Sequence, residues 1–598
     1  MENRKQNNRD NNGENCVETQ KRWQKSRKWL PELLAVVLCL VLMGIGISGK
    51  EGYHMDELLS FELANARYNP WIVPTQPVGR LAKFVNEEIQ GDTFTKTAGN
   101  LKDTVMDVLE NRGNSKLLSY KADVYEEPVW ITDEQFREYV TVDGSDAFDY
   151  LSVYFNVKDD NHPPVHFMLL HTMSSIFQRT LSPLLGCGMN LICLGITLWL
   201  LLRLGRQLGN IFSPDGDGKI LGIVAVLLYG MSTGALATVL LIRMYGLLSC
   251  LCVALLTIHV DKWKNQSFDR KNKALIAVTV LGFLTQYFFL FYCLLLAAVT
   301  VVILLCSNRK KELWIYIRSM ILAAVIGLVL FPFAISDVFS SGRGTEALGN
   351  LASGLQGYGE RILAFWKILA ERTVGTPLLV AGCVAGGIVL LVRSARAMRS
   401  RKAQEALCIL VIPPVGYFLL ASRMSPYLVD RYIMPLFPFA ALLLAILLCC
   451  FTQRIVKISG WRKKTVSVCA IAAIVLVQGM HLLSYDGEYL YQGYGRQEQL
   501  AEEYSETPCI CIYTGVGYYE NLPEFMHYCK TLLLTETELE NRKDTESLQE
   551  LAQVVVLLKP GVDEKAVLAN LVENYGFSTQ DRLLLAGVHG DSIYLLAK

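Results

Sequence analysis

Long uncharged apolar runs, separated by short polar connections, dominate the chain between Leu30 and Leu483. A run of about 20 apolar residues is long enough to cross the roughly 30 Å hydrocarbon core of a bilayer as a helix. The run at 274–306 is too long for one crossing, so we divide it into two helices that turn near Gln286. The pattern therefore predicts eleven spans, at 30–48, 184–204, 219–240, 243–260, 274–306 (two spans), 313–336, 376–393, 405–422, 432–451 and 465–484.

The segment HPPVHFMLLHTMSSIF, residues 162–177, is apolar enough to suggest a further span, and the basic residues decide against it. Lysine and arginine gather in cytoplasmic loops. If 162–177 is left out, the basic stretches DKWKNQSFDRKNK, NRKK, RSARAMRSRK and QRIVKISGWRKK all fall on the same side as the basic N-terminal arm. We therefore predict that 162–177 is a helix lying on the outer interface, with the N-terminus cytoplasmic and both 49–183 and the C-terminal tail outside.

Three regions lie outside the predicted bundle of residues 30–484. Residues 1–29 are polar and asparagine-rich, which predicts a disordered cytoplasmic arm. The outer loop 337–375 is rich in glycine, which suggests a mobile lid, whereas the outer loop 49–183 is long enough to fold against the membrane face. The tail, 485–598, alternates short apolar runs with helical stretches, which predicts a small extracytoplasmic α/β domain.

Composition narrows the function classes. The chain of 598 residues is 52% hydrophobic and only 19% charged, as expected of a polytopic membrane protein. A formal net charge of +1 gives no reason to expect a nucleic-acid partner. No phosphate-binding glycine loop is present, which argues against a nucleotide-driven pump, and the 16 cysteines form no Cys-x-x-Cys pair.

Isolated polar residues on the predicted outer side are the candidates for chemistry. Arginine at membrane depth is costly and usually has an anionic partner. Two interpretations stay open for these arginines: a structural pair with a carboxylate or a lipid headgroup, or a site for a lipid phosphate, which guanidinium groups bind well. The candidates are Asp56, Glu57, Asp160, His162, Arg243, Tyr245, Arg423, Arg431 and Tyr432.

These residue types would suffice to move a sugar from a polyprenyl phosphate. The leaving phosphate is already a stable anion, so the reaction does not need the carboxylic-acid partner of a glycosidase. It needs one base for the acceptor hydroxyl and cations for the departing phosphate. One carboxylate with outer arginines would supply both.

Four motifs carry a family resemblance: HMDELLSF, DNHPPVHFMLLH, IRMYGLL and DRYIMPLFPFAALLLA. In order and spacing they resemble the polytopic GT-C glycosyltransferases, in particular the bacterial family 39-like relatives of the protein O-mannosyltransferases and aminoarabinose transferases. The resemblance covers roughly residues 30 to 450. It implies that Asp56 is the catalytic base, that Glu57 positions it or the acceptor, and that Arg243 and Arg431 face the donor phosphate.

The resemblance also implies that the stretch from Asp160 to Pro164 begins a juxtamembrane helix beneath the site. Relatives often have His-Tyr where this chain has Gln286 and Tyr287, and the polar stretch 76–150 is extra. Neither the sugar, hexose or pentose, nor the envelope acceptor can therefore be carried over. The expected partners are membrane lipid and a polyprenyl-phosphate sugar.

Two further interpretations were weighed. His54, Asp56, Glu57 and His162 could converge on a divalent ion, but His166 and His171 belong to an apolar helix, and we expect no metal cofactor. A transporter or flippase of lipid-linked intermediates is the alternative function, although such proteins commonly show internal repeats and polar residues at the membrane midplane. An interfacial belt is expected for Tyr485, Tyr489, Tyr491 and Tyr494, rather than a sugar platform.

Overall fold

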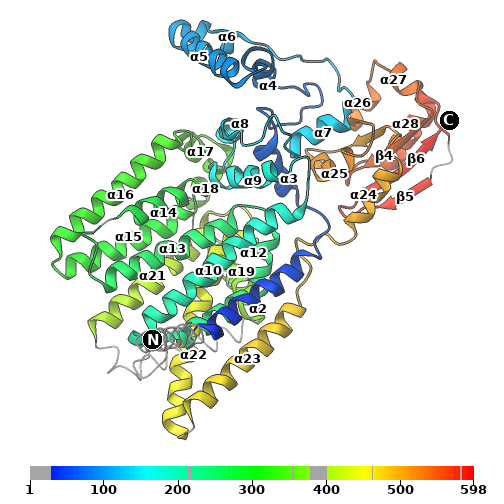
Figure 1. The fold of residues 1–598 in the computed structure, drawn as a ribbon. Coiled ribbons are helices and arrows are strands. Elements are labelled where there is room, and N and C mark those ends of the chain that lie inside the picture. The colour runs from blue at the N-terminus through cyan, green and yellow to red at the C-terminus, as the bar shows by residue number, and fades with distance from the viewer. Residues whose placement is uncertain are drawn as a thin grey trace, which may run out of the picture.

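The structure, a computed structural model, describes residues 29–212, 218–270, 272–352, 354, 356–376, 400–460, 462–578 and 582–598. Two predictions lie outside these residues: the cytoplasmic arm, apart from Trp29, and the span at 376–393, apart from its first residue. Figure 1 shows a bundle of long helices with a small sheet domain at one end.

Eight helices in the described ranges are long and apolar enough to cross a membrane. The prediction of a break near Gln286 is confirmed, because α14 (Lys273–Phe283) ends before Gln286 and α15 begins after it. The eight are α2 (Leu30–Ile47), α10 (Pro183–Phe212), α13 (Tyr245–Lys264), α15 (Phe289–Cys306), α16 (Lys310–Leu330), α21 (Arg401–Met424), α22 (Phe437–Ser459) and α23 (Lys463–Leu483).

The predicted span at 219–240 is broken in two. Helices α11 (Gly218–Gly230) and α12 (Thr233–Leu240) pass the same length and hydropathy test only as a pair, and they are bent by 60°. The bend falls where Ser232 takes an extended conformation and its hydroxyl accepts from the Ala235 amide, 3.1 Å away, which starts a new helix. With this pair the described part of the chain offers up to nine spans, so the predicted number of eleven is not reached there.

The segment 162–177 forms a short helix, as predicted, and its place on the outer interface stays a prediction. Its helix α9 (Val165–Ile176) has 12 residues, which at 1.5 Å per residue is far too short to cross a bilayer. It lies at the end of the bundle beside α3 (Met55–Asn65) and α8 (Tyr150–Asn156), as Figure 1 shows.

The glycine-rich segment 337–375 is largely helical, and its role as a mobile lid stays a prediction. It contains the end of α17 (Ala334–Phe339), then α18 (Gly342–Ala352) and α19 (Tyr358–Val374). The sequence YGERILAFWKILAERTV is amphipathic, and α19 packs against α12 and α21. Helix-forming residues between the glycines therefore outweigh the glycine content.

The C-terminal region forms the predicted α/β domain, but one strand comes from elsewhere in the chain. The sheet has the order β1-β3-β2-β4-β6-β5, and β2, β3 and β4 run parallel. Strand β1 (Ile131–Thr132) belongs to the long segment between α2 and α10 and pairs antiparallel with β3. The other strands are β2 (Cys509–Ile512), β3 (Lys530–Leu534), β4 (Gln553–Leu558), β5 (Arg582–Ala586) and β6 (Ser592–Ala597).

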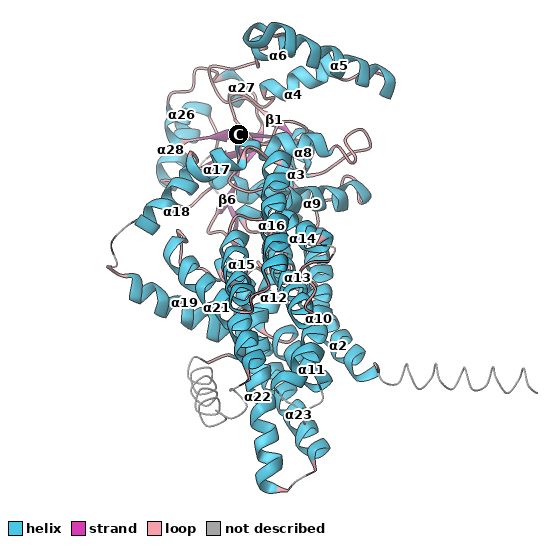
Figure 2. Ribbon diagram, turned by 90° about the vertical axis from the view of Figure 1, so that its left-hand side faces the viewer, coloured by secondary structure: helices cyan, strands magenta, loops and turns pink. Residues whose placement is uncertain are grey.

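Further helices complete this domain and the segment between α2 and α10. Figure 2 shows α4, α5 and α6 at the end of the molecule opposite α22 and α23. The segment between α2 and α10 contains α4 (Arg80–Phe84), η1 (Val85–Ile89), α5 (Phe94–Asn111), η2 (Arg112–Asn114), α6 (Lys116–Ser119), α7 (Asp133–Val140) and η3 (Val157–Asp159). The sheet domain contains α24 (Tyr494–Glu503), η6 (Gly517–Asn521), α25 (Leu522–Phe525), α26 (Glu536–Glu540), α27 (Glu546–Gln549) and α28 (Glu564–Tyr575).

Candidate active site

Asp56 and Glu57 lie on the first turn of α3, just past the end of α2. His54 is the N-cap, and its Nδ1 accepts from the Asp56 amide at 3.0 Å. The Glu57 carboxylate accepts in return from the His54 amide at 2.7 Å, which completes a capping box. Two carboxylates at a helix N-terminus also suit the positive end of the helix dipole.

Glu57 is fully buried and its oxygens are occupied. The ammonium of Lys50, whose side chain is also fully buried, lies 3.0 Å and 3.3 Å from the two carboxylate oxygens. The Ile242 amide donates to the same carboxylate at 2.7 Å. Glu57 therefore ties α3 to the end of α2 and to the α12–α13 connection.

Asp56 is half-buried and faces two arginines. Arg431 donates directly to its carboxylate, and Arg243 donates to its carbonyl oxygen at 3.1 Å. Burial alone would raise the pKa of Asp56, but the charges of Arg243 and Arg431 outweigh burial and hold this pKa well below its usual range. Asp56 is therefore an ionised carboxylate at neutral pH.

Arg243 is held in the short connection between α12 and α13. It is 6% exposed and donates to the Ser60 hydroxyl at 2.8 Å, one turn along α3 from Asp56. Its Nε is buried without a hydrogen-bond partner. Tyr245, the first residue of α13, is buried beside it. The guanidinium is thus fixed against α3 and keeps donor capacity that the protein does not use.

Arg431 reaches Asp56 from a different part of the chain. It lies in η4 (Asp430–Tyr432), 375 residues from Asp56. Its guanidinium lies 5.6 Å from the centre of the Tyr432 ring, and its Nε is buried without a hydrogen-bond partner. Burial would lower the pKa of Arg431, but Tyr245, Asp56 and Tyr432 raise it, so the group stays charged. After η4, η5 (Met434–Leu436) leads into α22.

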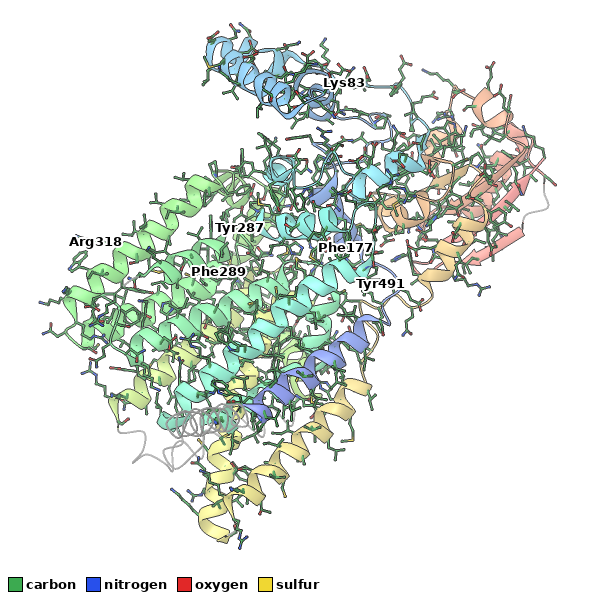
Figure 3. All side chains as sticks on the ribbon, viewed as in Figure 1. Lys83, Phe177, Tyr287, Phe289, Arg318 and Tyr491 are labelled. Atoms are coloured by element: carbon green, nitrogen blue, oxygen red, sulfur yellow. The ribbon has the colours of Figure 1, made fainter. Side chains whose placement is uncertain are left out.

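Asp160 and His162 form a second polar cluster near Arg243. The Asp160 carboxylate lies 2.9 Å from His162 Nδ1. Burial would raise the pKa of Asp160, but His162 and Arg243 lower it overall. His166 follows on α9 with both ring nitrogens buried and unpartnered, and burial lowers its pKa to about 3. Tyr287, labelled in Figure 3, lies near this end of the bundle and donates to Asp337 at 2.6 Å.

Other predicted residues take different surroundings. Arg423 donates to the Gly354 carbonyl at 2.8 Å and lies 5.2 Å from the Tyr358 ring, so it faces the start of α19. Two of the four tail tyrosines do not fit the expected interfacial belt. Tyr489 and Tyr494 are buried, and Tyr491 lies where the bundle meets the sheet domain (Figure 3).

Metal-ligand side chains are only loosely grouped. His54 Nδ1 is 3.7 Å from the Asp56 carboxylate, and His162 pairs with Asp160. Among the described residues, no three histidine, cysteine or acidic side chains are arranged to hold a metal ion. Glu57, a candidate ligand, already accepts from Lys50 and two backbone amides.

Two residues that touch the groups around Asp56 were not among the candidates for the site: Lys50, and Tyr489, which was expected in an interfacial belt. A signal for Lys50 existed: it is a lone cation directly after the first span, on the side where cations are scarce. Tyr489 had no such signal, because its contact with Asp430 joins positions 59 residues apart.

The structure is a helical bundle with a carboxylate–arginine cluster at one end and a small α/β domain beyond it, and solved structures with a similar fold are known. ArnT from Cupriavidus metallidurans, in a crystal structure bound to undecaprenyl phosphate, is similar over 95% of this chain and 98% of its own, with a TM-score of 0.51 and 11% identity. The apo structure of ArnT from the same organism gives a TM-score of 0.41 and 14% identity, over 73% of this chain and 87% of its own. No family model and no curated protein matches the sequence.

Proposed function

We propose that this protein transfers a sugar from a polyprenyl-phosphate donor to an acceptor hydroxyl at the outer face of the membrane. The observation that carries the proposal is the cluster at the N-terminus of α3, where an ionised Asp56 is in contact with Arg431 and Arg243. The likeness of the fold to ArnT, which was crystallised with undecaprenyl phosphate, supports a lipid phosphate as the donor.

In the proposed reaction the acceptor oxygen attacks the anomeric carbon of the sugar. The bond from that carbon to the phosphate oxygen breaks with its electron pair left on the phosphate, and the acceptor proton moves to Asp56. A single displacement of this kind inverts the anomeric centre. Arg431 and Arg243, each with an unused buried Nε, would stabilise the charge on the departing phosphate.

The orientation follows from charge. The basic loops between the spans indicate the cytoplasmic side, which puts the Asp56 cluster, the sheet domain and the C-terminus outside. The donor lipid would then reach the site from the outer leaflet, with Asp160, His162 and α9 below it.

The alternative function is transport of a lipid-linked intermediate. Such a role would need a polar path through the bundle, whereas the candidate residues gather at one end of it, around α3 and η4. A transporter would move the labelled donor across proteoliposomes without breaking its glycosidic bond.

We propose that no metal takes part, because two arginines supply the positive charge that the leaving phosphate requires. Treatment of the purified protein with a chelator should leave the transfer rate unchanged. A loss of rate that Mg²⁺, Mn²⁺ or Zn²⁺ restores would contradict this part of the proposal.

The test of the function is direct. Purified protein in detergent or nanodiscs is given a panel of polyprenyl-phosphate hexoses and pentoses, and release of polyprenyl phosphate is followed with and without added envelope glycans, lipids and peptides. Release that depends on Asp56 for at least one donor supports the proposal. Intact donor in every case, with wild-type protein that binds none of the lipids, would reject it.

A further inference from the structure

The segment that joins α23 to the sheet domain, residues 485–493, crosses close to the candidate active site. Its backbone pairs with the residues just before α3: the Glu51 amide donates to the Leu490 carbonyl at 2.8 Å, and the Gly493 amide donates to the Glu51 carboxylate at 2.6 Å. The Lys50 ammonium lies 5.2 Å from the Tyr491 ring. This connection is therefore fastened to the entry of α3 over several residues.

Tyr489 is the residue of this segment that reaches two parts of the site. Its hydroxyl donates to the Asp430 carboxylate at 2.7 Å, and Asp430 directly precedes Arg431. Its carbonyl oxygen accepts from the Lys50 ammonium at 2.7 Å. Tyr489, Asp430 and Lys50 are all buried, so water does not compete for these contacts.

On the α3 side, the contacts lead from Tyr489 to the helix turn that carries Asp56. Lys50 holds the Glu57 carboxylate at 3.0 Å, and Glu57 accepts from the His54 amide at 2.7 Å. These bonds fix the first turn of α3 and with it the direction of the Asp56 side chain. None of them uses an oxygen of the Asp56 carboxylate.

On the η4 side, Asp430 is held by two groups. Arg372 of α19 lies 3.1 Å from its carboxylate, and the same arginine contacts Asp486 and Glu488 of the connecting segment. The Tyr489 hydroxyl completes this set. Arg431 follows on the same short helical turn, so a fixed Asp430 fixes the starting point of the Arg431 side chain.

The backbone of the segment supports a role beyond that of a simple linker. Tyr489 and Tyr491 have φ values of 68° and 52°, in the left-handed region that residues with side chains seldom adopt. A conformation of this kind is kept only when the surrounding contacts require it. Here it directs the Tyr489 carbonyl to Lys50 and the hydroxyl to Asp430.

We propose that Tyr489 and Lys50 are positioning residues: the connecting segment holds the base, Asp56, and the phosphate-binding residue, Arg431, in register with each other. The inference rests on the proposed function, since it assigns these roles to Asp56 and Arg431. The connecting segment, residues 485–493, would thus couple the sheet domain to the reaction.

The contacts on the α3 side and those on the η4 side should affect different kinetic constants. Tyr489→Phe removes only the hydroxyl that holds Asp430, so the Michaelis constant for the donor should rise about tenfold, the size expected from one hydrogen bond to a charged group, with kcat within about twofold of wild type. The double variant Lys50→Gln/Glu57→Gln removes both buried charges together and should lower kcat about tenfold with little change in donor affinity. Lys50→Arg should retain most of the wild-type kcat.

Tyr494→Phe is the matched control. Tyr494 is a buried tyrosine directly after the connecting segment, at the start of α24. Its hydroxyl donates to Glu524 inside the sheet domain. Its loss should change neither kinetic constant by more than about twofold. Melting temperatures of all variants, measured with and without undecaprenyl phosphate, separate a loss of folding from a loss of positioning.

A double-mutant cycle decides whether Tyr489 acts through Arg431. In the Arg431→Ala background, Tyr489→Phe should change donor affinity by less than twofold. An unchanged donor affinity in the single Tyr489→Phe variant, or the same tenfold loss with and without Arg431, would overturn the inference while leaving the proposed function intact. If wild-type protein neither cleaves nor binds the lipid donor, the proposed function fails and this inference fails with it.

Discussion

Asp56 and Glu57 are neighbours in the sequence, on one turn of one helix, yet the fold gives them opposite surroundings. The side chains of Glu57 and Lys50 are fully buried, whereas those of Asp56 and Arg431 are 22% and 17% exposed. A buried, fully paired carboxylate has no free oxygen for a substrate. An ion pair that reaches the surface can exchange one partner for another, as the proposed function requires of a base beside a phosphate.

The comparison predicts its largest effect for Asp56→Asn. The amide keeps the size of the side chain and can accept from Arg431, so the protein should fold and bind donor, but it cannot take a proton. We expect kcat to fall by about 10³-fold, within the range for loss of a general base. Single-turnover release of polyprenyl phosphate from a radiolabelled donor measures this, and wild-type turnover by the variant would remove Asp56 from the mechanism.

Breaking the buried pair of Lys50 and Glu57 should lower the stability of the fold. Lys50→Met leaves the Glu57 carboxylate buried without its cation, and breaking a buried pair in this way costs about 3–5 kcal/mol. We expect a clearly lower melting temperature in detergent, and partial recovery when Glu57→Gln is added. A variant as stable as wild type would mean that Glu57 can reach water or another cation.

Arg431→Ala tests the exposed pair. Donor affinity should fall by about tenfold or more, because one guanidinium is lost from the phosphate site. The variant should also change the pH profile. In the wild type, Asp56 stays ionised as pH falls to its lowered pKa, so the acid limb of kcat/KM lies below the ordinary carboxyl pKa of about 3.9.

Burial raises the pKa of Asp56, and the charge of Arg431 is one of the effects that lower it. The pKa of Asp56 should therefore rise when Arg431 is removed. The acid limb should therefore move to higher pH in Arg431→Ala. Values of kcat/KM, measured at donor concentrations well below KM from roughly pH 4 to 8, check the direction, and an acid limb that does not move would contradict the pairing of Asp56 with Arg431.

Arg423→Ala should have the smallest effect. This arginine donates to the Gly354 carbonyl beside the Tyr358 ring, so its loss should change donor affinity by less than about twofold. Donor titration of the variant beside Arg431→Ala gives the comparison. A loss of donor affinity as large as that of Arg431→Ala would indicate that Arg423 also binds the donor phosphate.

Local patterns were enough to predict most of the helices. The apolar runs, the break near Gln286 and the short helix at 162–177 follow from run length and the distribution of basic residues, which operate over tens of consecutive residues. The helices within the glycine-rich stretch 342–374 could not be recognised from glycine content, because the signal for them is the amphipathic repeat between the glycines.

What the sequence by itself determined is the set of candidate groups: the carboxylates of Asp56 and Glu57 and the cations Arg243 and Arg431. Only the tertiary structure decided which carboxylate is free to react, that Arg423 turns towards α19, and that β1 completes the C-terminal sheet. The physical reason is the distance along the chain over which each effect acts. Hydrophobic length and charge sorting act along the chain, whereas burial and pairing depend on residues such as Asp56 and Arg431, which lie 375 positions apart.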